Sequence, residues 1–396
     1  MLVLENLREK IGVASKPVYL NMLIIGGSVF LFLFAIQLIG SALGLIGKDY
    51  AQYIVDATAN PSIGLFIGLL STAILQSSST TTSMAVAAVA AGSLSLENAI
   101  PIIMGANVGT TLTSTLVSMS YVTKAAEFKK AIAAGSVHDI FNVLTVILIF
   151  PLEIKYGLLS NLSHSLAALI NFKQGGTPIA DSFFIYRMFK SISELMISWV
   201  GPYFALVIAI VLLIAIVKFI SNILYKKLVG NVRDRFQSAI FKSTFKAFGW
   251  GFLFTSIVQS SSLTTSLIVP VAATGQVKLK RAFQFIMGAN LGTTITALLA
   301  AVFKNEAAIS LALAHFLFNT AGVFLFLMIP LLGRIPLYLA DKLGSISLRY
   351  RLTAFAYILT IFFVLPFTLI YFSKKSNLTV FHKDEASQTV IVQTEK

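Results

Sequence analysis

The chain has 396 residues, of which 57% are hydrophobic and only 12% are charged. Soluble domains average about 25% charged residues, so this composition predicts an integral membrane protein. The formal net charge is +14. Because cytoplasmic loops of membrane proteins collect Lys and Arg, we attribute this charge to topology and expect no nucleic-acid partner. The chain has no cysteine, which excludes disulfides, thiolate metal sites and cysteine nucleophiles.

The N-terminal residues 1–19 carry Arg8, Lys10 and Lys16 among apolar residues and lack the pattern of a cleaved signal peptide. We therefore expect a cytoplasmic lead-in. Seven long apolar runs follow, and each is long enough to cross a bilayer as a helix. They cover residues 20–47, 98–120, 131–152, 201–225, 281–303, 307–333 and 352–373.

Two further apolar stretches, 61–91 and 244–275, are each interrupted by the same polar sequence, Gln-Ser-Ser-Ser. The arms on either side have about 12–15 residues, fewer than the roughly 20 that a spanning helix needs. Polar, irregular backbone at membrane depth is tolerated only inside protein or beside a water-filled cavity. Both stretches are therefore predicted to be re-entrant hairpins.

The distribution of Lys and Arg predicts the orientation of the chain. With the N-terminus in the cytoplasm and each hairpin returning to the side it enters from, most basic residues lie in cytoplasmic loops. Residues 153–200 then become an extracytoplasmic amphipathic connection. Residues 334–373 are expected to form a basic loop and a final transmembrane helix, and the polar tail 374–396 ends outside.

The strongest pattern is an internal repeat. A shift of 183 residues places 68–116 on 251–299 without a gap, and Gln76 falls on Gln259. A match of this length at so long a period indicates two copies of one structural unit.

Each half of the chain, 20–152 and 201–333, is predicted to contain a helix, a hairpin, a broken transmembrane helix and a further helix. An odd number of crossings separates the halves. The sequence therefore predicts an all-α integral membrane protein with two inverted-topology repeats. Inverted repeats with broken elements at matching positions are typical of secondary transporters, whose site lies where the repeats meet.

The two polar clusters have the chemistry of an anion site. Each supplies one amide and three hydroxyls directly before a helix restarts. The free N–H groups and positive dipole of such a helix start favour phosphate or a carboxylate. Hydroxyl and carbonyl oxygens at the break also suit sodium. Alternatively, these Ser and Thr side chains only bridge neighbouring helices.

A second repeated sequence, Gly-Ala-Asn-x-Gly-Thr-Thr, contains Asn107 and Asn290. Its small residues would allow helices to approach closely. Its Asn and Thr residues would also loosen the helix and offer carbonyl oxygens to a cation.

Two histidines, His138 and His315, also repeat, and we expect them to join helices. Asp139 has no acidic counterpart, because Phe316 stands at the matching position, so the sequence assigns it no role. The chain contains no Walker-type loop, His-Glu-x-x-His or Gly-x-Ser-x-Gly motif. We therefore expect no ATP-driven transport, no enzymatic activity and no cofactor.

The paired Gln-Ser-Ser-Ser stretches resemble those of the type II sodium-dependent phosphate cotransporter family and its bacterial relatives. The resemblance includes residues 99–110, 128–142, 315–319 and 349–357 and extends from about 20 to 373. It implies a compact bacterial-type sodium/phosphate symporter in the cell inner membrane.

The resemblance implies that phosphate lies between the two hairpin tips. The residues expected there are Gln76, Ser77, Ser78, Ser79, Gln259, Ser260, Ser261 and Ser262, with Asn107 and Asn290 beside them. It also implies a sodium ion beside the second hairpin, at Gln259, Ser260, Thr293 and Thr296. The first-half counterparts are Gln76, Ser77, Thr110 and Thr113. Relatives often have Ser at the positions of Ala106 and Ala289. The alanines of this chain lack that hydroxyl, so each set of sodium residues has one hydroxyl fewer.

We therefore expect sodium-coupled import of inorganic phosphate by alternating access, with sodium as the coupling ion. The expected partners are phosphate, sodium and the lipid bilayer, and a homodimer is left open. A sodium- or proton-coupled carrier of another oxyanion or carboxylate is one alternative. An anion channel or a non-transporting membrane scaffold is the alternative from a different class.

Overall fold

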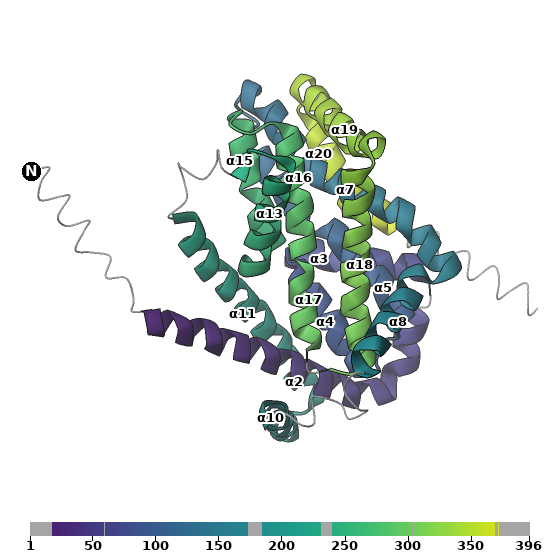
Figure 1. The fold of residues 1–396 in the computed structure, drawn as a ribbon. Coiled ribbons are helices and arrows are strands. Elements are labelled where there is room, and N and C mark those ends of the chain that lie inside the picture. Colours follow the sequence, from purple (N-terminus) through teal and green to yellow (C-terminus); the bar gives the residue numbers. More distant parts are fainter. Residues whose placement is uncertain are drawn as a thin grey trace, which may run out of the picture.

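A computed structural model describes residues 18–58, 60–172, 184–230, 240–302, 304–368 and 371. Every regular element in these residues is a helix, which confirms the all-α prediction (Figure 1). The predicted lead-in 1–19 lies almost wholly outside the described residues, and the tail 374–396 lies entirely outside them.

Within the described ranges, six helical stretches are long and apolar enough to cross a membrane. They correspond to the first six predicted runs and cover Gly26–Ile46, Leu96–Met119, Ala125–Tyr156, Pro202–Ile220, Leu279–Ala301 and Glu306–Met328.

The first half of the chain forms six helices, followed by a two-helix connection. The helices are α2 (Val18–Thr58), α3 (Pro61–Leu75), α4 (Ser78–Ala90), α5 (Leu96–Gly109), α6 (Leu112–Met119) and α7 (Ala125–Tyr156). The connection predicted at 153–200 contains α8 (Leu158–Phe172) and α10 (Phe184–Val200). Glu153 joins α7 to α8, because its carboxylate accepts hydrogen bonds from Leu159 N and Ser160 N at the start of α8.

The second half repeats these elements, except that the counterpart of α4 is divided into two helices. Its helices are α11 (Pro202–Gly230), α13 (Thr244–Val258), α14 (Ser261–Ser266), α15 (Ile268–Ala273), α16 (Leu279–Gly292), α17 (Thr294–Ala301) and α18 (Glu306–Met328). A shift of 183 residues carries α3 onto α13 and α5 onto α16 without an offset at either end. The sequence repeat is therefore also a repeat of helix boundaries.

Side-chain caps fix several of these boundaries. Asn60 accepts a hydrogen bond from Ser62 N immediately before Pro61, a residue suited to the first position of a helix. Ser243 caps α13 through Lys246 N in the same way. Each cap satisfies a backbone N–H that the first turn of the helix leaves free.

Two stretches at the C-terminal end differ from prediction. The region expected to begin with a basic loop forms α19 (Pro330–Arg349), which packs on α7. Its buried residues, Pro336, Ala340, Gly344 and Ser347, recur at helical spacing and give α19 one face of small side chains. The final predicted run begins with α20 (Leu352–Leu359) and a short π-helix (Thr360–Val364), and its apolar helical stretch ends at Thr368.

Two glycines related by the repeat, Gly68 and Gly251, allow α3 to pack closely against α5 and α13 against α16. A Cβ atom on Gly68 would overlap the carbonyl of Ile102, and one on Gly251 would overlap the carbonyl of Phe285. The helix backbones therefore touch directly, which only small residues permit.

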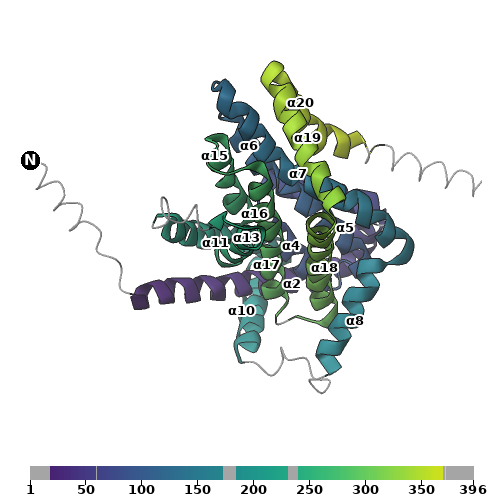
Figure 2. The same ribbon diagram turned by 45° about the horizontal axis from the view of Figure 1, so that its top comes forward.

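The two halves are interleaved rather than placed end to end. Asn305, before α18, donates from Nδ2 to Ala90 O at the end of α4, at 3.0 Å. At another contact, Ala131 of α7 packs with Val269 and Ala273 of α15. The views in Figures 1 and 2 both place α17 and α18 side by side in the middle of the molecule.

The glycine packing predicts that two glycine-to-alanine substitutions in α13 differ in their effect on the melting temperature. Gly251→Ala should lower the melting temperature, because forcing a methyl group against the Phe285 carbonyl typically costs about 1–3 kcal/mol. Gly249→Ala is the control, because nothing lies within 4 Å of its added Cβ. It should leave the melting temperature unchanged or raise it, since Ala favours helix over Gly by about 1 kcal/mol. Thermal unfolding in detergent measures both, and equal effects would contradict the direct backbone contact.

Candidate functional site

The two Gln-Ser-Ser-Ser clusters adopt the same local structure. Gln76 (φ 53°) and Gln259 (φ 56°) end α3 and α13 in the left-handed conformation, and within the described ranges no other non-glycine residue has positive φ. This conformation costs an L-residue on the order of 1 kcal/mol. Such strain is commonly found at binding and active sites.

A serine follows each strained glutamine and caps the next helix. Ser77 Oγ accepts a hydrogen bond from Thr80 N at 3.2 Å, and Ser260 Oγ accepts one from Leu263 N at 3.3 Å. In the first half the chain then folds back, because Thr72 Oγ1 on α3 donates to Thr81 Oγ1 on α4 at 2.8 Å. Each cluster therefore ends one helix and starts another within two residues.

The structure brings the two clusters together. Ser79 Oγ donates to the carbonyl oxygen of Gln259 at 2.9 Å, which joins residues 180 positions apart. Ser262 Oγ lies 3.4 Å from Thr110 O, so the second cluster also reaches the broken helix of the first half.

The clusters have a buried side and a more accessible side. Ser78, Ser79, Ser261 and Ser262 are at most 5% exposed. Gln76 is exposed, and Ser77, Gln259 and Ser260 are half-buried.

The helix breaks near the predicted sodium residues are short. Only Thr110 and Thr111 separate α5 from α6, and only Thr293 separates α16 from α17. Thr110 and Thr293 keep helical dihedral angles, and their hydroxyls donate to Ala106 O at 2.8 Å and Ala289 O at 3.1 Å.

Three hydroxyl oxygens on the helices around the second cluster have no hydrogen-bond partner among the described residues. They belong to Thr255 and Ser256 on α13 and to Thr296 on α17, another predicted sodium residue, and the side chains of Thr255 and Thr296 are at most 1% exposed. Buried polar atoms are nearly always paired in folded proteins, so such unpaired oxygens are candidate ligands for an ion. Thr113 is half-buried on α6.

Asn107 and Asn290 lie in a buried hydrogen-bond network that crosses between the halves. His138 Nε2 is 3.1 Å from Asn290 Oδ1, and His315 Nε2 is 3.4 Å from Asn107 Oδ1. Each histidine of one half thus contacts the asparagine of the other half. The oxygen atoms of both amides are therefore engaged in contacts between the halves.

Two further asparagines complete this network. Asn290 Nδ2 donates to Asn142 Oδ1 at 2.9 Å and to Asn319 Oδ1 at 2.5 Å, and Asn142 Nδ2 donates to Asn107 O at 3.0 Å. Sequence reasoning gave Asn142 and Asn319 no role, although the repeated His-x-x-x-Asn pattern in α7 and α18 was a signal for them.

Asp139 is the residue that the sequence reasoning missed most clearly. It is fully buried in the middle of α7, and Thr115 Oγ1 donates to its Oδ2 at 2.6 Å. Its Oδ1 has no hydrogen-bond partner in good geometry among the described residues. The signal was an ionisable residue inside an apolar helix, which by default marks a functional site whether or not the repeat conserves it.

Comparison with known proteins identifies relatives of the chain. The model of the Na+/Pi-cotransporter family matches residues 31–166 and 195–340, so it covers a segment in each half. Sodium-dependent phosphate transport protein 2A of Rattus norvegicus is 30% identical over 86% of this chain and 66% of its own length. Sodium-dependent phosphate transport protein 2C of Rattus norvegicus is 30% identical over 91% of this chain and 75% of its own length.

The protein 2B of Homo sapiens is 28% identical over 88% of this chain and 64% of its own length. The chain thus spans about two thirds of the length of these longer relatives. No solved structure matches the chain. The family match covers most of both halves, including both clusters and the network between them, and the chain belongs to the Na+/Pi-cotransporter family.

Proposed function

We propose that the chain imports inorganic phosphate together with sodium, and that phosphate binds between the two Gln-Ser-Ser-Ser clusters. The observation that carries this proposal is the contact between Ser79 of one cluster and Gln259 of the other. The names of the relatives, which are sodium-dependent phosphate transport proteins, support the substrate and the coupling ion.

The chemistry of the clusters suits a phosphate ion. Serine hydroxyls and the first N–H groups of α4 donate hydrogen bonds, and the positive end of the helix dipole favours an anion. The negative charge of phosphate does not have to be neutralised by a Lys or Arg side chain in contact with it, provided that cations bind together with the anion. Sodium ions would supply that positive charge.

We assign one sodium ion to the surroundings of Gln259, Ser260, Thr293 and Thr296. The unpaired oxygens of Thr296 and Thr255 support this assignment. The matching first-half position would use Gln76, Ser77, Thr110 and Thr113. Hydroxyl and carbonyl oxygens are suitable ligands for such a hard cation.

We assign a further cation to Asp139. A carboxylate at membrane depth must be neutralised by a partner or a proton, and its contacts in the described part of the chain are hydroxyls. Because Phe316 takes the matching place in the second half, this position would exist once per chain.

Coupling follows from differential binding. Sodium stabilises the arrangement of the clusters that phosphate needs, and phosphate in turn raises the affinity for sodium. In alternating access the two halves would move around this shared site. The contacts of His138 with Asn290 and of His315 with Asn107 would then lie at the axis about which one half rotates against the other.

The transport claim is tested by phosphate uptake into proteoliposomes. Uptake should require an inward sodium gradient, and Gln76→Ala or Gln259→Ala should each lower it at least about tenfold. The reason is that a hydrogen bond to a charged group contributes about 1.5–3 kcal/mol. Gln276→Ala, at an exposed glutamine between α15 and α16, is the control and should transport normally. Equal uptake in potassium alone would refute sodium coupling, and sulfate competition would expose a broader oxyanion carrier.

The cation at Asp139 is tested by the sodium dependence of uptake. Asp139→Asn removes the charge with little change in shape, so uptake should depend less steeply on sodium concentration than in the wild type. Asp341→Asn, at an exposed residue 3.4 Å from Lys129, is the control and should leave the curve unchanged. If Asp139→Asn changes the pH dependence of uptake but not its sodium dependence, the group carries a proton and not a sodium ion.

Inverted topology is proposed from the way the halves interleave. The Ala90–Asn305 contact joins the α4–α5 turn to the α17–α18 turn, and the packing of Ala131 on α15 joins the start of α7 to the end of the second hairpin. If these contacts lie near opposite membrane faces, α5 and α16 cross in opposite directions.

Single cysteines test the inverted topology cleanly, because the chain has none of its own. Glu97 and Lys280 are exposed, matched by the repeat, and located at the starts of α5 and α16. An impermeant thiol reagent applied to sealed, oriented vesicles should label Glu97→Cys and Lys280→Cys from opposite sides. Labelling from the same side would contradict inversion.

A further inference from the structure

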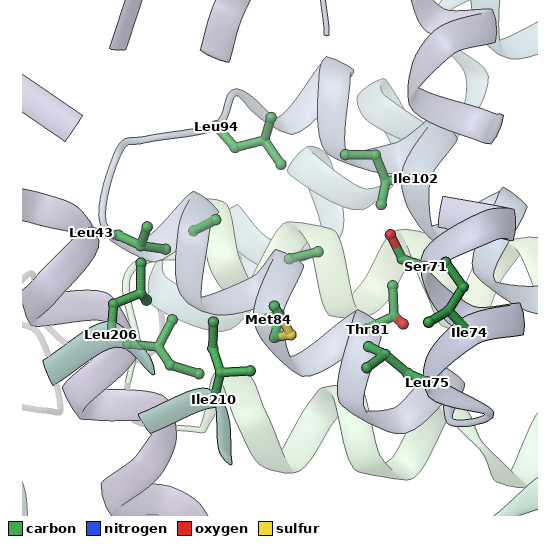
Figure 3. Close-up of a pocket in the computed structure, with 13 residues that line it drawn as sticks. Leu43, Ser71, Ile74, Leu75, Thr81, Met84, Leu94, Ile102, Leu206 and Ile210 are labelled. Carbon is green, nitrogen blue, oxygen red and sulfur yellow. The ribbon is translucent and has the colours of Figure 1, made fainter. Parts of the chain in front are cut away.

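A cavity of about 510 Å³ lies beside the first hairpin (Figure 3). Residues of α3 and α4 form one wall, and residues of α2 and α11 form the other. Its volume is within the roughly 300–1,000 Å³ of small-molecule sites. Apart from the hydroxyls of Ser71 and Thr81, the side chains that line it are apolar, so water would find few partners there.

The second half of the chain carries larger side chains at four positions equivalent to lining residues, and smaller ones at two, where Val258 matches Leu75 and Val277 matches Leu94. A shift of 183 residues replaces four lining residues by larger ones: Ser71 by Phe254, Ala85 by Ile268, Ala88 by Val271 and Ile102 by Phe285. Ile268 and Phe285 are only 3% and 4% exposed. Ala85 and Ala88 therefore have larger, buried or half-buried counterparts in the second half, Ile268 and Val271.

The position of the cavity indicates what fills it. Ile39 and Leu43, Ile102, and Leu206 and Ile210 belong to three helices that are long and apolar enough to cross a membrane. All five are closer to the Ile46, Leu96 and Pro202 ends of these stretches, so the cavity lies at the depth of one leaflet.

The surface around the cavity is apolar as well. Ile74 on its rim is 74% exposed, and Val207, next to Leu206 on α11, is 59% exposed. In a membrane, the medium against these side chains is the hydrocarbon of the lipids. A lipid acyl chain is therefore the apolar occupant with direct access.

We propose that this cavity binds one acyl chain of a bilayer lipid and that the bound chain steadies the first hairpin. Leu75 lines the cavity and immediately precedes the strained Gln76. Thr81 also lines it and is hydrogen-bonded to Thr72 and to the Ser77 carbonyl. An occupant thus presses on both arms of the hairpin next to its tip. The effect on transport rests on the proposed function, whereas the binding of the chain does not.

Binding is tested with the full-length protein in nanodiscs that contain phosphatidylcholine with a photoactivatable diazirine in the middle of one acyl chain. Mass spectrometry of peptides should find labelling in α4 near Met84 and in α11 near Leu206. The double variant Ala85→Ile/Ala88→Val, which copies the second half, should lose labelling at both places. Leu206→Trp, which fills the cavity from the opposite wall, should do the same, and the exposed control Val207→Trp should keep it.

Unchanged labelling in both filled variants would overturn the lipid site. The effect on the hairpin has its own measurement: the rate of phosphate uptake in bilayers of straight-chain and of branched-chain lipids. The uptake rate of the wild type should differ between the two kinds of bilayer, whereas that of the filled double variant should be the same in both. Equal changes in the wild type and the variant would overturn the effect of the bound chain on the hairpin. Wild-type labelling without any phosphate uptake would refute the proposed function and leave the lipid site standing.

Discussion

The structure depends on the need to pair buried polar groups inside a mostly apolar molecule. Hydrocarbon offers no hydrogen bonds, so polar side chains in the interior depend on partners within the protein or on a bound ligand. His138 pairs with Asn290, and His315 pairs with Asn107, across the two halves. Each histidine and each asparagine of this set therefore has its partner in the other half. The same arrangement brings the Gln-Ser-Ser-Ser clusters into contact at Ser79 and Gln259.

Much of this architecture could be predicted from the sequence, because duplication made the pattern visible twice. The arms of the hairpins end where the polar clusters begin, and α3 and α13 stop at Gln76 and Gln259. The all-α class and six long apolar helices followed from composition and run length. The direct backbone contacts at Gly68 and Gly251 could not be predicted, because they depend on which two helices meet. The repeated glycines Gly105 and Gly288, which lie at the same two helix contacts, were an indication of them in the sequence.

Other features could not be predicted, for identifiable physical reasons. Periodicity gives helices but not their partners, so the crossing of histidine and asparagine between the halves was invisible. Asp139 was assigned no role because the repeat does not preserve it, although a carboxylate inside an apolar helix is by itself a signal of function. The basic region 334–349 was expected to be a loop, but small side chains at helical spacing allow α19 to pack on α7. The cavity beside the first hairpin was likewise not predicted, because it depends on how side chains of four separate helices meet.

The central claim is that phosphate is held by both clusters at once and only together with sodium. The most direct measurement is protection of single cysteines in a chain that otherwise has none. With Ser77→Cys and with Ser260→Cys, at half-buried positions of the two clusters, the rate of modification by a small thiol reagent is measured with and without phosphate. Phosphate should slow modification at both positions in sodium and at neither in potassium. Protection at only one position, or protection that does not require sodium, would contradict the claim.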